Sequence, residues 1–326
     1  MTRTSPDPTA PADAPRGATP PLEFGNRAFV GLTTQAVVTR GGAIAPGRAI
    51  VIDSPREFDA SLVPIEPARD LLVHGAYMAE AVAISLLRKG LRGIIGVDAG
   101  IGRNDAGVAG LAVADALGVP AAAVSVYSCE MCDGRSVWTQ GVISRVNAAA
   151  AALGAEPGQG VPAAAERMLA APAGQVREVA SRLPEAPQRL AAGDGGQVWG
   201  CWSMSLIREP HTADVFCVGT PVDTTMTVYM YRHGVRPAGV IGSDGGFGRA
   251  QMAIAGLGIL ERMGIACAAV SHLSADLGDG ASIYHDGIVT KANRQAAAAG
   301  VAPGMRATEA AALLLRQAAR HADAGA

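Results

Sequence analysis

Aromatic residues, long apolar runs and an excess of charge of either sign are all scarce in this sequence of 326 residues. Phe, Trp and Tyr together make up 4% of it, and the formal net charge is −2. A nearly neutral chain without a basic stripe argues against recognition of nucleic acid or of an anionic membrane surface. Glycines or charges interrupt every apolar run before it reaches the length of a membrane span, so we expect no transmembrane helix.

Cysteine is also sparse, and its number is odd. An odd number of cysteines scattered through a chain of this size indicates reduced thiols and a cytoplasmic location, and not a disulfide framework. Residues 1–22 are rich in Pro, Thr and Ala and lack the apolar core of a secretory signal. We predict that they form a disordered tail.

A stretch of about 60 residues occurs twice in the chain. Residues 93–152 and 239–298 align without a gap at an offset of about 146 positions, with about 24 identities. Short apolar strands alternate with helices in both copies, which is typical of βαβ units. The sequence predicts an α/β fold of two tandem-duplicated lobes with parallel, Rossmann-like sheets related by a pseudo-two-fold axis. The first lobe is expected over 23–172, a linker over 173–196 and the second lobe over 197–326.

The strands also predict where a ligand would bind. In open α/β sheets, ligands bind beyond the carboxyl ends of the strands. Three loops of each lobe are expected there, starting at His74, Asp98 and Val126 in the first lobe and at Thr220, Asp244 and His272 in the second. After the third loop of each lobe we expect a helix, over about 137–153 and from Ile283.

The second loop of each lobe is rich in glycine and ends in arginine. Glycines allow tight turns, a helix N-terminus offers N–H groups to an anion, and arginine adds a positive charge. The alternative is a close-packed turn in which the aspartate caps a helix. Neither loop completes a dinucleotide fingerprint or a P-loop. Together with the strand-end histidine, the predicted ligand-binding residues are His74, Asp98, Gly100, Gly102, Arg103, Asp105, Asp244, Gly246, Gly248 and Arg249.

The third loop carries a repeated Asp-Gly-x-Ser sequence. It gives Asp133 and Ser136 in the first copy, and Asp279 and Ser282 in the second. Asp-Gly favours a turn and serine favours a helix N-cap, so a structural role explains much of the pattern. The functional alternative is that these loops meet around one small ligand and supply hydrogen bonds or a base.

The two copies differ most in their reactive groups. The first has Cys129 and Cys132, whereas the second has His272 and His285. A lone CxxC pair is compatible with ordinary loop thiols, a redox pair or, with further ligands, a zinc site. It is also compatible with a cysteine nucleophile and a histidine base across a cleft. These four residues join Asp133, Ser136, Asp279 and Ser282 as the predicted catalytic set.

The sequence predicts no organic cofactor and no dedicated metal ligand. A divalent cation stays an open alternative if the four loop aspartates converge, since carboxylates are its preferred ligands.

The leading hypothesis for function is an enzyme, first a hydrolase, acting on a small anionic or amide-bearing metabolite bound between the lobes. Alternatives are an isomerase or racemase with one acid/base group per lobe, a small-molecule-binding regulatory protein, and a nucleotide-dependent enzyme using the glycine loops. Low charge and many Ala and Gly residues favour a homo-oligomer.

Overall fold

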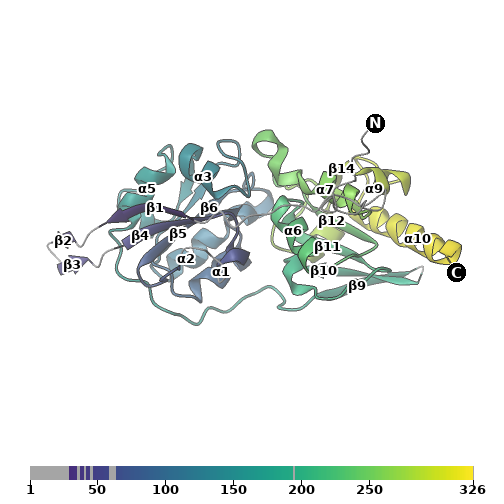
Figure 1. Ribbon diagram of the computed structural model, residues 1–326, viewed down its shortest axis with the longest axis horizontal. Coiled ribbons are helices and arrows are strands. Elements are labelled where there is room, and N and C mark those ends of the chain that lie inside the picture. Colours follow the sequence, from purple (N-terminus) through teal and green to yellow (C-terminus); the bar gives the residue numbers. More distant parts are fainter. Residues whose placement is uncertain are drawn as a thin grey trace, which may run out of the picture.

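The computed structural model describes residues 29–34, 37–39, 42–44, 47–58, 64–193 and 195–325. It contains two α/β lobes side by side, each a mostly parallel sheet with helices on both faces (Figure 1). We use "first lobe" for the elements from β1 to α5 and "second lobe" for those from β9 to α10. The predicted tail, residues 1–22, lies outside the described residues.

The first sheet has the strand order β1-β4-β5-β6-β7-β8. Its four central strands are parallel, and β1 and β8 are antiparallel to their neighbours at the two edges. The strands are β1 (Phe29–Thr34), β4 (Gly47–Ile52), β5 (Asp70–Tyr77), β6 (Gly93–Val97), β7 (Ala121–Val124) and β8 (Ile143–Val146), with β2 (Val37–Thr39) and β3 (Gly42–Ile44) paired separately.

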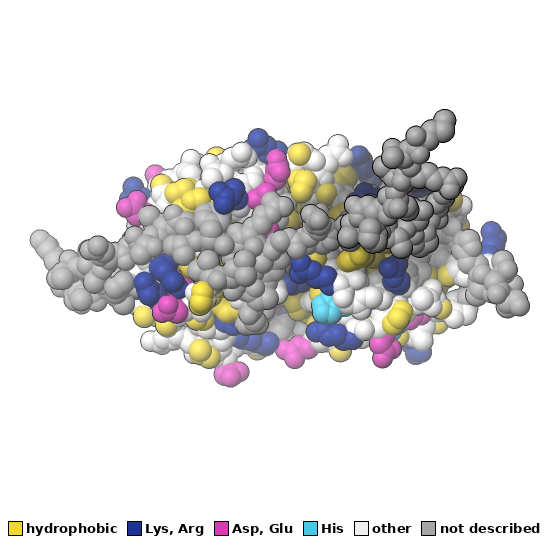
Figure 2. All heavy atoms as spheres, viewed as in Figure 1, with side chains coloured by type: hydrophobic (Ala, Val, Ile, Leu, Met, Phe, Trp, Pro, Cys, Tyr) yellow, Lys and Arg dark blue, Asp and Glu magenta, His cyan; other side chains and the backbone are white. Residues whose placement is uncertain are grey.

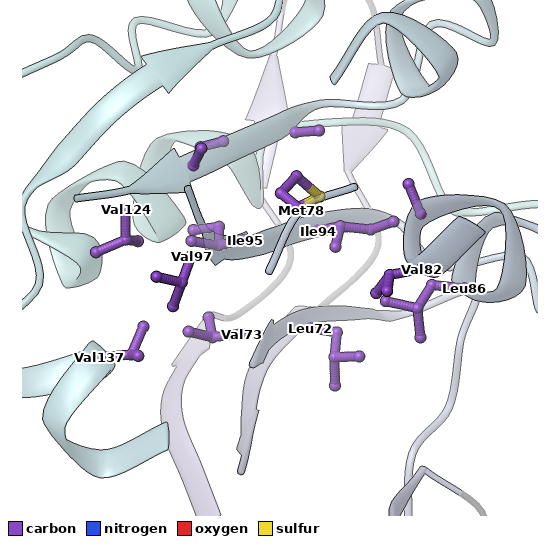
Figure 3. Close-up of a cluster of buried hydrophobic side chains, with 14 of the residues drawn as sticks. Leu72, Val73, Met78, Val82, Leu86, Ile94, Ile95, Val97, Val124 and Val137 are labelled. Carbon is purple, nitrogen blue, oxygen red and sulfur yellow. The ribbon is translucent and has the colours of Figure 1, made fainter. Parts of the chain in front are cut away.

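Helices cover both faces of this sheet. Figure 1 places α1 and α2 on one face and α3 and α5 on the other. Ile94 lies toward Val82 and Leu86 of α1, whereas Ile95 lies on the side of Val137 of α3 (Figure 3), because neighbouring strand residues point to opposite faces. The helices are α1 (Glu80–Leu87), α2 (Gly110–Ala116), α3 (Gly134–Gln140), α4 (Ala148–Ala152) and α5 (Val161–Met168), with the 3₁₀ helices η1 (Pro55–Glu57) and η2 (Arg103–Val108).

The second sheet has the order β9-β10-β11-β12-β13-β14, again with parallel central strands and antiparallel edges. Its strands are β9 (Gln188–Gly193), β10 (Gly196–Cys201), β11 (Val215–Pro221), β12 (Gly239–Ser243), β13 (Ala266–Val270) and β14 (Val289–Ala292). The expected α/β class is therefore confirmed, although both sheets are mixed where the sequence predicted parallel ones.

Alternate residues of β11 face two separate apolar cores in the second lobe. Val215 and Cys217 pack with α8 and α10, whereas Phe216 and Val218 pack with α6 and α7. The helices are α6 (Thr224–Arg232), α7 (Gly256–Arg262), α8 (Gly280–Asp286), α9 (Arg294–Ala298) and α10 (Ala307–Gly325), with η3 (Met204–Leu206) and η4 (Arg249–Ile254). Within the described ranges, no helix combines the length and apolar character needed to cross a membrane.

Three local expectations were wrong. The helix expected over 137–153 is split into α3, β8 and α4, because Gly141 ends α3 and Asn147 caps α4. The helix expected from Ile283 is split in the same way into α8, β14 and α9. Within the expected linker, residues 188–193 form the edge strand β9, which pairs with β10.

The core position Ile95 gives a test of the first lobe. It is fully buried, so Ile95→Ala should lower the free energy of unfolding by about 2–5 kcal/mol, and Ile95→Val by about 0.5–1.5 kcal/mol. Urea unfolding followed by circular dichroism measures both. Val176 is 78% exposed, and Val176→Ala should change stability by less than about 0.5 kcal/mol. Equal effects at the two positions would contradict the assigned core.

Candidate functional site

Each glycine loop begins with a buried aspartate that ties together two loops of its own lobe. Asp98 Oδ1 accepts hydrogen bonds from the backbone N–H groups of Gly100 and Val126, both at 3.0 Å. In the same arrangement, Asp244 Oδ1 accepts hydrogen bonds from the backbone N–H groups of Gly246, at 3.1 Å, and of His272, at 3.0 Å. Both aspartates are at most 4% exposed. They are therefore internal anchors of the loops.

The two glycine loops meet backbone to backbone between the lobes. A Cβ atom on Gly100 would lie 3.1 Å from Gly246 Cα, and one on Gly246 would lie equally close to Gly100 Cα. Both residues also have positive φ angles, +76° and +71°. Glycine is required at both positions by the close approach and by the backbone conformation.

Arg103, at the end of the first glycine loop, binds the second lobe. Its backbone N–H donates to His272 O at 2.8 Å, and its guanidinium donates to Ser274 O at 2.7 Å. The guanidinium also pairs with Asp276 and Asp286, each at 2.9 Å. The sequence predicted that the Arg103 guanidinium binds a ligand, but in the structure it is bonded to the second lobe.

Arg249 makes the corresponding contacts with the first lobe. Its backbone N–H donates to Val126 O at 2.9 Å, and Nη1 donates to Ser128 O at 3.2 Å and to Gln140 Oε1 at 2.6 Å. The residues before the two arginines, Gly102 and Gly248, also face the opposite lobe: an added Cβ would meet a carbonyl oxygen there at 3.0 Å and 3.3 Å. Asp105, by contrast, is solvent-exposed in η2.

The repeated Asp-Gly-x-Ser sequences build helix starts. Asp133 caps α3 by accepting from Ser136 N at 2.9 Å, and Ser136 Oγ accepts from the Glu130 backbone and donates to a side chain of α3. Asp279 and Ser282 make the same kinds of contact at α8. Here the aspartate, rather than the serine, is the N-cap. Asp279 also lines a hollow of about 10 Å³, which holds no more than a water molecule.

The cysteines and histidines of the predicted catalytic set do not form a nucleophile–base pair. Cys129 is fully buried, and burial raises the pKa of its thiol to about 12, with a further rise from Asp98. Burial also raises the pKa of Cys132 well above its ordinary value, and Cys132 Sγ lies 3.9 Å from a threonine hydroxyl. His272 Nδ1 lies 2.7 Å from Asp244 Oδ1, and His285 is exposed. Thiols held in the protonated form are weak nucleophiles.

His74 lies inside β5, so the expectation of a strand-end histidine was wrong. Its ring is fully buried, and both ring nitrogens lack hydrogen-bond partners among the described residues. Burial lowers the pKa of His74 to about 3, which keeps the imidazole neutral at ordinary pH. Gly96 on the next strand makes room for the ring, since a Cβ there would collide with it.

A cavity of about 470 Å³ lies elsewhere along the junction of the lobes. Loops after β4 and β10, strands β5 and β11, and helices α1 and α6 surround it. Its lining consists of Ser54, Pro55, Arg56, Ala76, Tyr77, Val82, Ser85 and Lys89 from the first lobe, and of Trp202, Ser203, Ser205, Leu206, Arg208, Thr220, Asp223, Thr225, Tyr229 and His233 from the second. None of the sequence-predicted site residues lines it. Its volume is that of a small-molecule site.

Matching serines turn the chain at the wall of this cavity. Ser54 follows β4 and Ser203 follows β10, and each caps a 3₁₀ helix with nearly the same backbone angles. Arg56 reaches across the junction, where Nη2 donates to Ser203 Oγ at 2.8 Å and Nη1 donates to Thr225 Oγ1 at 3.2 Å. The lobes therefore hold a guanidinium in the cavity wall through neutral hydroxyls.

A buried carboxylate and a buried phenol line the same cavity. Asp223, 2% exposed, caps α6: Oδ1 accepts from Met226 N and from Thr225 Oγ1, both at 2.8 Å. Tyr77 is 3% exposed, and its hydroxyl has no hydrogen-bond partner among the described residues. Burial raises the pKa of Tyr77; the Arg56 charge lowers it and the Asp223 charge raises it. Phenol, guanidinium and carboxylate therefore interact electrostatically.

Positive charge gathers toward the mouth of the cavity. Arg208 and His233 are exposed lining residues and Lys89 is partly exposed, and we call these three basic residues the rim cations. Figure 2 shows lysine and arginine side chains beside a histidine near the middle of the face in view. With Arg56, the basic residues of the lining outnumber its one acidic residue, Asp223. Such a site favours an anion.

Sequence reasoning missed this cavity because its residues carry no motif. The repeat gave no signal for Tyr77 and Asp223 either: both lie outside the aligned stretches, and they are not counterparts in the two lobes, since Tyr77 matches Pro221 and Asp223 matches Ala79. Within the described ranges, no three His, Cys, Asp or Glu side chains gather as a metal site requires. Comparisons with protein-family models, with curated proteins and with solved structures gave no match.

Loss of the Arg103 guanidinium should loosen the junction of the lobes. Arg103→Met removes bonds to a carbonyl and two carboxylates. Because the side chain is partly exposed, we expect a loss of about 1–2 kcal/mol in the free energy of unfolding. Faster amide hydrogen exchange at the loop of residues 271–276 would accompany it. Arg145→Met is the control, since that arginine donates only to the carbonyl of Ser144. Equal losses of stability in the two variants would contradict the role of Arg103 in joining the lobes.

His74 should make the protein less stable in acid. Its pKa is about 3 when folded and about 6.5 when unfolded, so the unfolded state binds the extra proton between these values. Stability should fall as the pH decreases from about 6.5 to about 3, by up to about 1.4 kcal/mol per pH unit from this residue. His74→Thr should flatten that slope in urea unfolding measured across the range. The exposed His285→Thr is the control. An unchanged dependence of the unfolding free energy on pH in His74→Thr would contradict the lowered pKa of His74.

Proposed function

We propose that this protein is an enzyme that binds a small anionic metabolite in the cavity between the lobes and moves a proton with Asp223 and Tyr77. The observation that supports this most is the pairing of a buried carboxylate with a buried, unpartnered phenol in the wall of a positively charged cavity. Active sites are where burial and neighbouring charge act together on ionisable groups. The cavity also has the volume of a metabolite site.

The positions of the two groups favour a reaction with one group on each side of the substrate. Tyr77 comes from the first lobe, at the end of β5, and Asp223 comes from the second lobe, at the start of α6. We propose that the lobes arose by tandem duplication and are related by a pseudo-two-fold axis. The phenol and the carboxylate are not counterparts in the two lobes, because Tyr77 matches Pro221 in strand pairing and Asp223 matches Ala79 as a helix N-cap. This arrangement suits the isomerase class better than a single nucleophile does.

The proposed step is proton transfer at carbon. The Asp223 carboxylate takes a proton from a carbon next to a carbonyl or carboxylate group, the C–H electron pair moves onto the oxygen of that group, and the Tyr77 hydroxyl and the Arg56 guanidinium donate hydrogen bonds to the oxyanion. The protonated Asp223 then delivers the proton to a different carbon of the delocalised anion, as the electron pair moves back from the oxygen, which shifts a double bond and completes an isomerisation. The raised pKa of Tyr77 keeps the phenol protonated, as a hydrogen-bond donor must be.

Hydrolysis is the second candidate, and one contact favours it. Thr225 Oγ1 donates to Asp223 Oδ1 at 2.8 Å, which is the geometry of a hydroxyl nucleophile beside its base. Attack by Thr225 Oγ1 on an amide carbonyl would transfer the hydroxyl proton to Asp223 and place the oxyanion near Arg56. Collapse of the oxyanion would break the C–N bond as Asp223 returns the proton to the leaving amine, and water would then hydrolyse the ester formed on Thr225. A route through Cys129 or Cys132 is less favoured, because burial keeps both thiols protonated.

Asp223→Asn should abolish proton transfer while preserving the fold. Asparagine is also a good N-cap, so α6 should persist, but the amide cannot act as a base. A thermal-shift screen of small carboxylates, cyclic amides, nucleotides and divalent cations identifies binders. Nuclear magnetic resonance in D₂O then follows C–H exchange in each binder. We expect losses of about 10²–10⁴-fold in the exchange rate for Asp223→Asn, with a smaller loss for Tyr77→Phe.

Other variants separate the candidates. Asp115→Asn removes an exposed carboxylate far from the cavity and should leave exchange unchanged. Thr225→Val should stop hydrolysis but only reduce C–H exchange, because it removes one hydrogen bond to Asp223 and one to Arg56 and leaves both groups in place. Binding without any chemical change in the binders would favour a regulatory protein, and stabilisation by nucleotides alone would rule out the proposed substrate class.

A further inference from the structure

The two arginines that line the cavity are held by neutral groups, in contrast to the arginines that pair with carboxylates. Arg48, Arg103 and Arg182 pair with carboxylates. Arg56 donates to two hydroxyls, and Arg208 donates to the backbone carbonyl of Ser205 at 2.9 Å. Among the described residues neither has an ion-pair partner. Their charges are therefore oriented by neutral groups and left uncompensated, which is the arrangement expected of anion-binding arginines.

Tyr229 places the two guanidinium groups relative to each other. Arg56 Cζ lies 5.9 Å and Arg208 Cζ lies 5.6 Å from the centroid of its ring. The two carbons can therefore be no farther apart than the sum of these distances, 11.5 Å. The Tyr229 hydroxyl donates to two backbone carbonyls, Ser205 O at 3.2 Å and Ile207 O at 2.9 Å, so the ring is fixed. A molecule of a few carbons can reach both arginines.

Exposure distinguishes the two positions. Arg56 is partly buried beside Ser203 and Thr225, whereas Arg208 is exposed at the rim with Lys89 and His233. One anionic group of a ligand would pair with Arg56 inside the cavity, and a second would pair with Arg208 at the rim.

We propose that the substrate is a small dianion with two separate anionic groups, one bound by Arg56 and the other by Arg208 with the rim cations. This inference rests on the proposed function, because it assigns the substrate of that same cavity. It also places the reacting carbon between the anionic groups, where Tyr77 and Asp223 reach it. A dicarboxylate and a phosphorylated carboxylate share this chemistry.

Calorimetric titration of the full chain at low ionic strength tests the proposal. The probes are unbranched dicarboxylates from malonate to adipate, the matching monocarboxylates from acetate to hexanoate, phosphoglycolate and inorganic phosphate. The best dicarboxylate should bind at least about tenfold more tightly than its monocarboxylate match, since one added ion pair in a partly desolvated site is worth about that factor. Phosphoglycolate binding more tightly than every dicarboxylate would assign one group as a phosphate.

Variants assign the two anionic groups to the two arginines. Arg208→Gln should weaken the best dianion about tenfold and leave its monoanionic match unchanged, whereas Arg56→Gln should weaken both. Arg316→Gln removes an exposed arginine of α10 and should change neither. Equal binding of dianions and monoanions, no binding of any dianion, or an unchanged preference in Arg208→Gln overturns the proposal. Loss of C–H exchange in Asp223→Asn is a separate readout, so the proposed function can stand if the dianion preference fails.

Discussion

The close approach of the two glycine loops is the constraint on which the rest of the molecule depends. Gly100 and Gly246 bring the backbones of the two lobes into contact, and a side chain at either position would be crowded and would strain the backbone. Arg103 and Arg249 then donate across the junction into backbone carbonyls of the opposite lobe. Because this contact joins the carboxyl ends of the two sheets, the loops after β4 and β10 face one another and enclose the cavity.

Much of the fold is readable from the sequence, because apolar strands and glycine-terminated helices leave strong local patterns. The α/β class and most central strands were predicted in this way. The edge strands β8 and β14 were missed, since each is four residues long and lies between two short helices. β9 was missed because its residues are mostly exposed, so no apolar run identified it.

The site was harder to predict because a repeated motif has two physical explanations. A residue present in both copies of a repeat can bind a ligand, or it can hold one copy against the other. For Arg103 and Arg249 the contacts are of the second kind. The two buried aspartates have a third role, since each ties together two loops of its own lobe. The cavity instead depends on side chains such as Arg56 and Thr225, which are 169 positions apart and meet only in the folded chain. No local pattern signals such a pair.

Junction residues and cavity residues therefore have different roles in the proposed enzyme. Residues that match between the copies make the junction, and a junction between similar lobes needs the same contacts on both sides. Residues that differ, such as Tyr77 and Asp223, line the cavity, and a substrate with two unlike ends needs unlike groups. The partly buried Arg56 lacks an ion-pair partner among the described residues, and a bound anion would offset the desolvation cost of its charge. Fixing the junction with matching contacts therefore leaves the cavity side chains free to differ in charge and acidity.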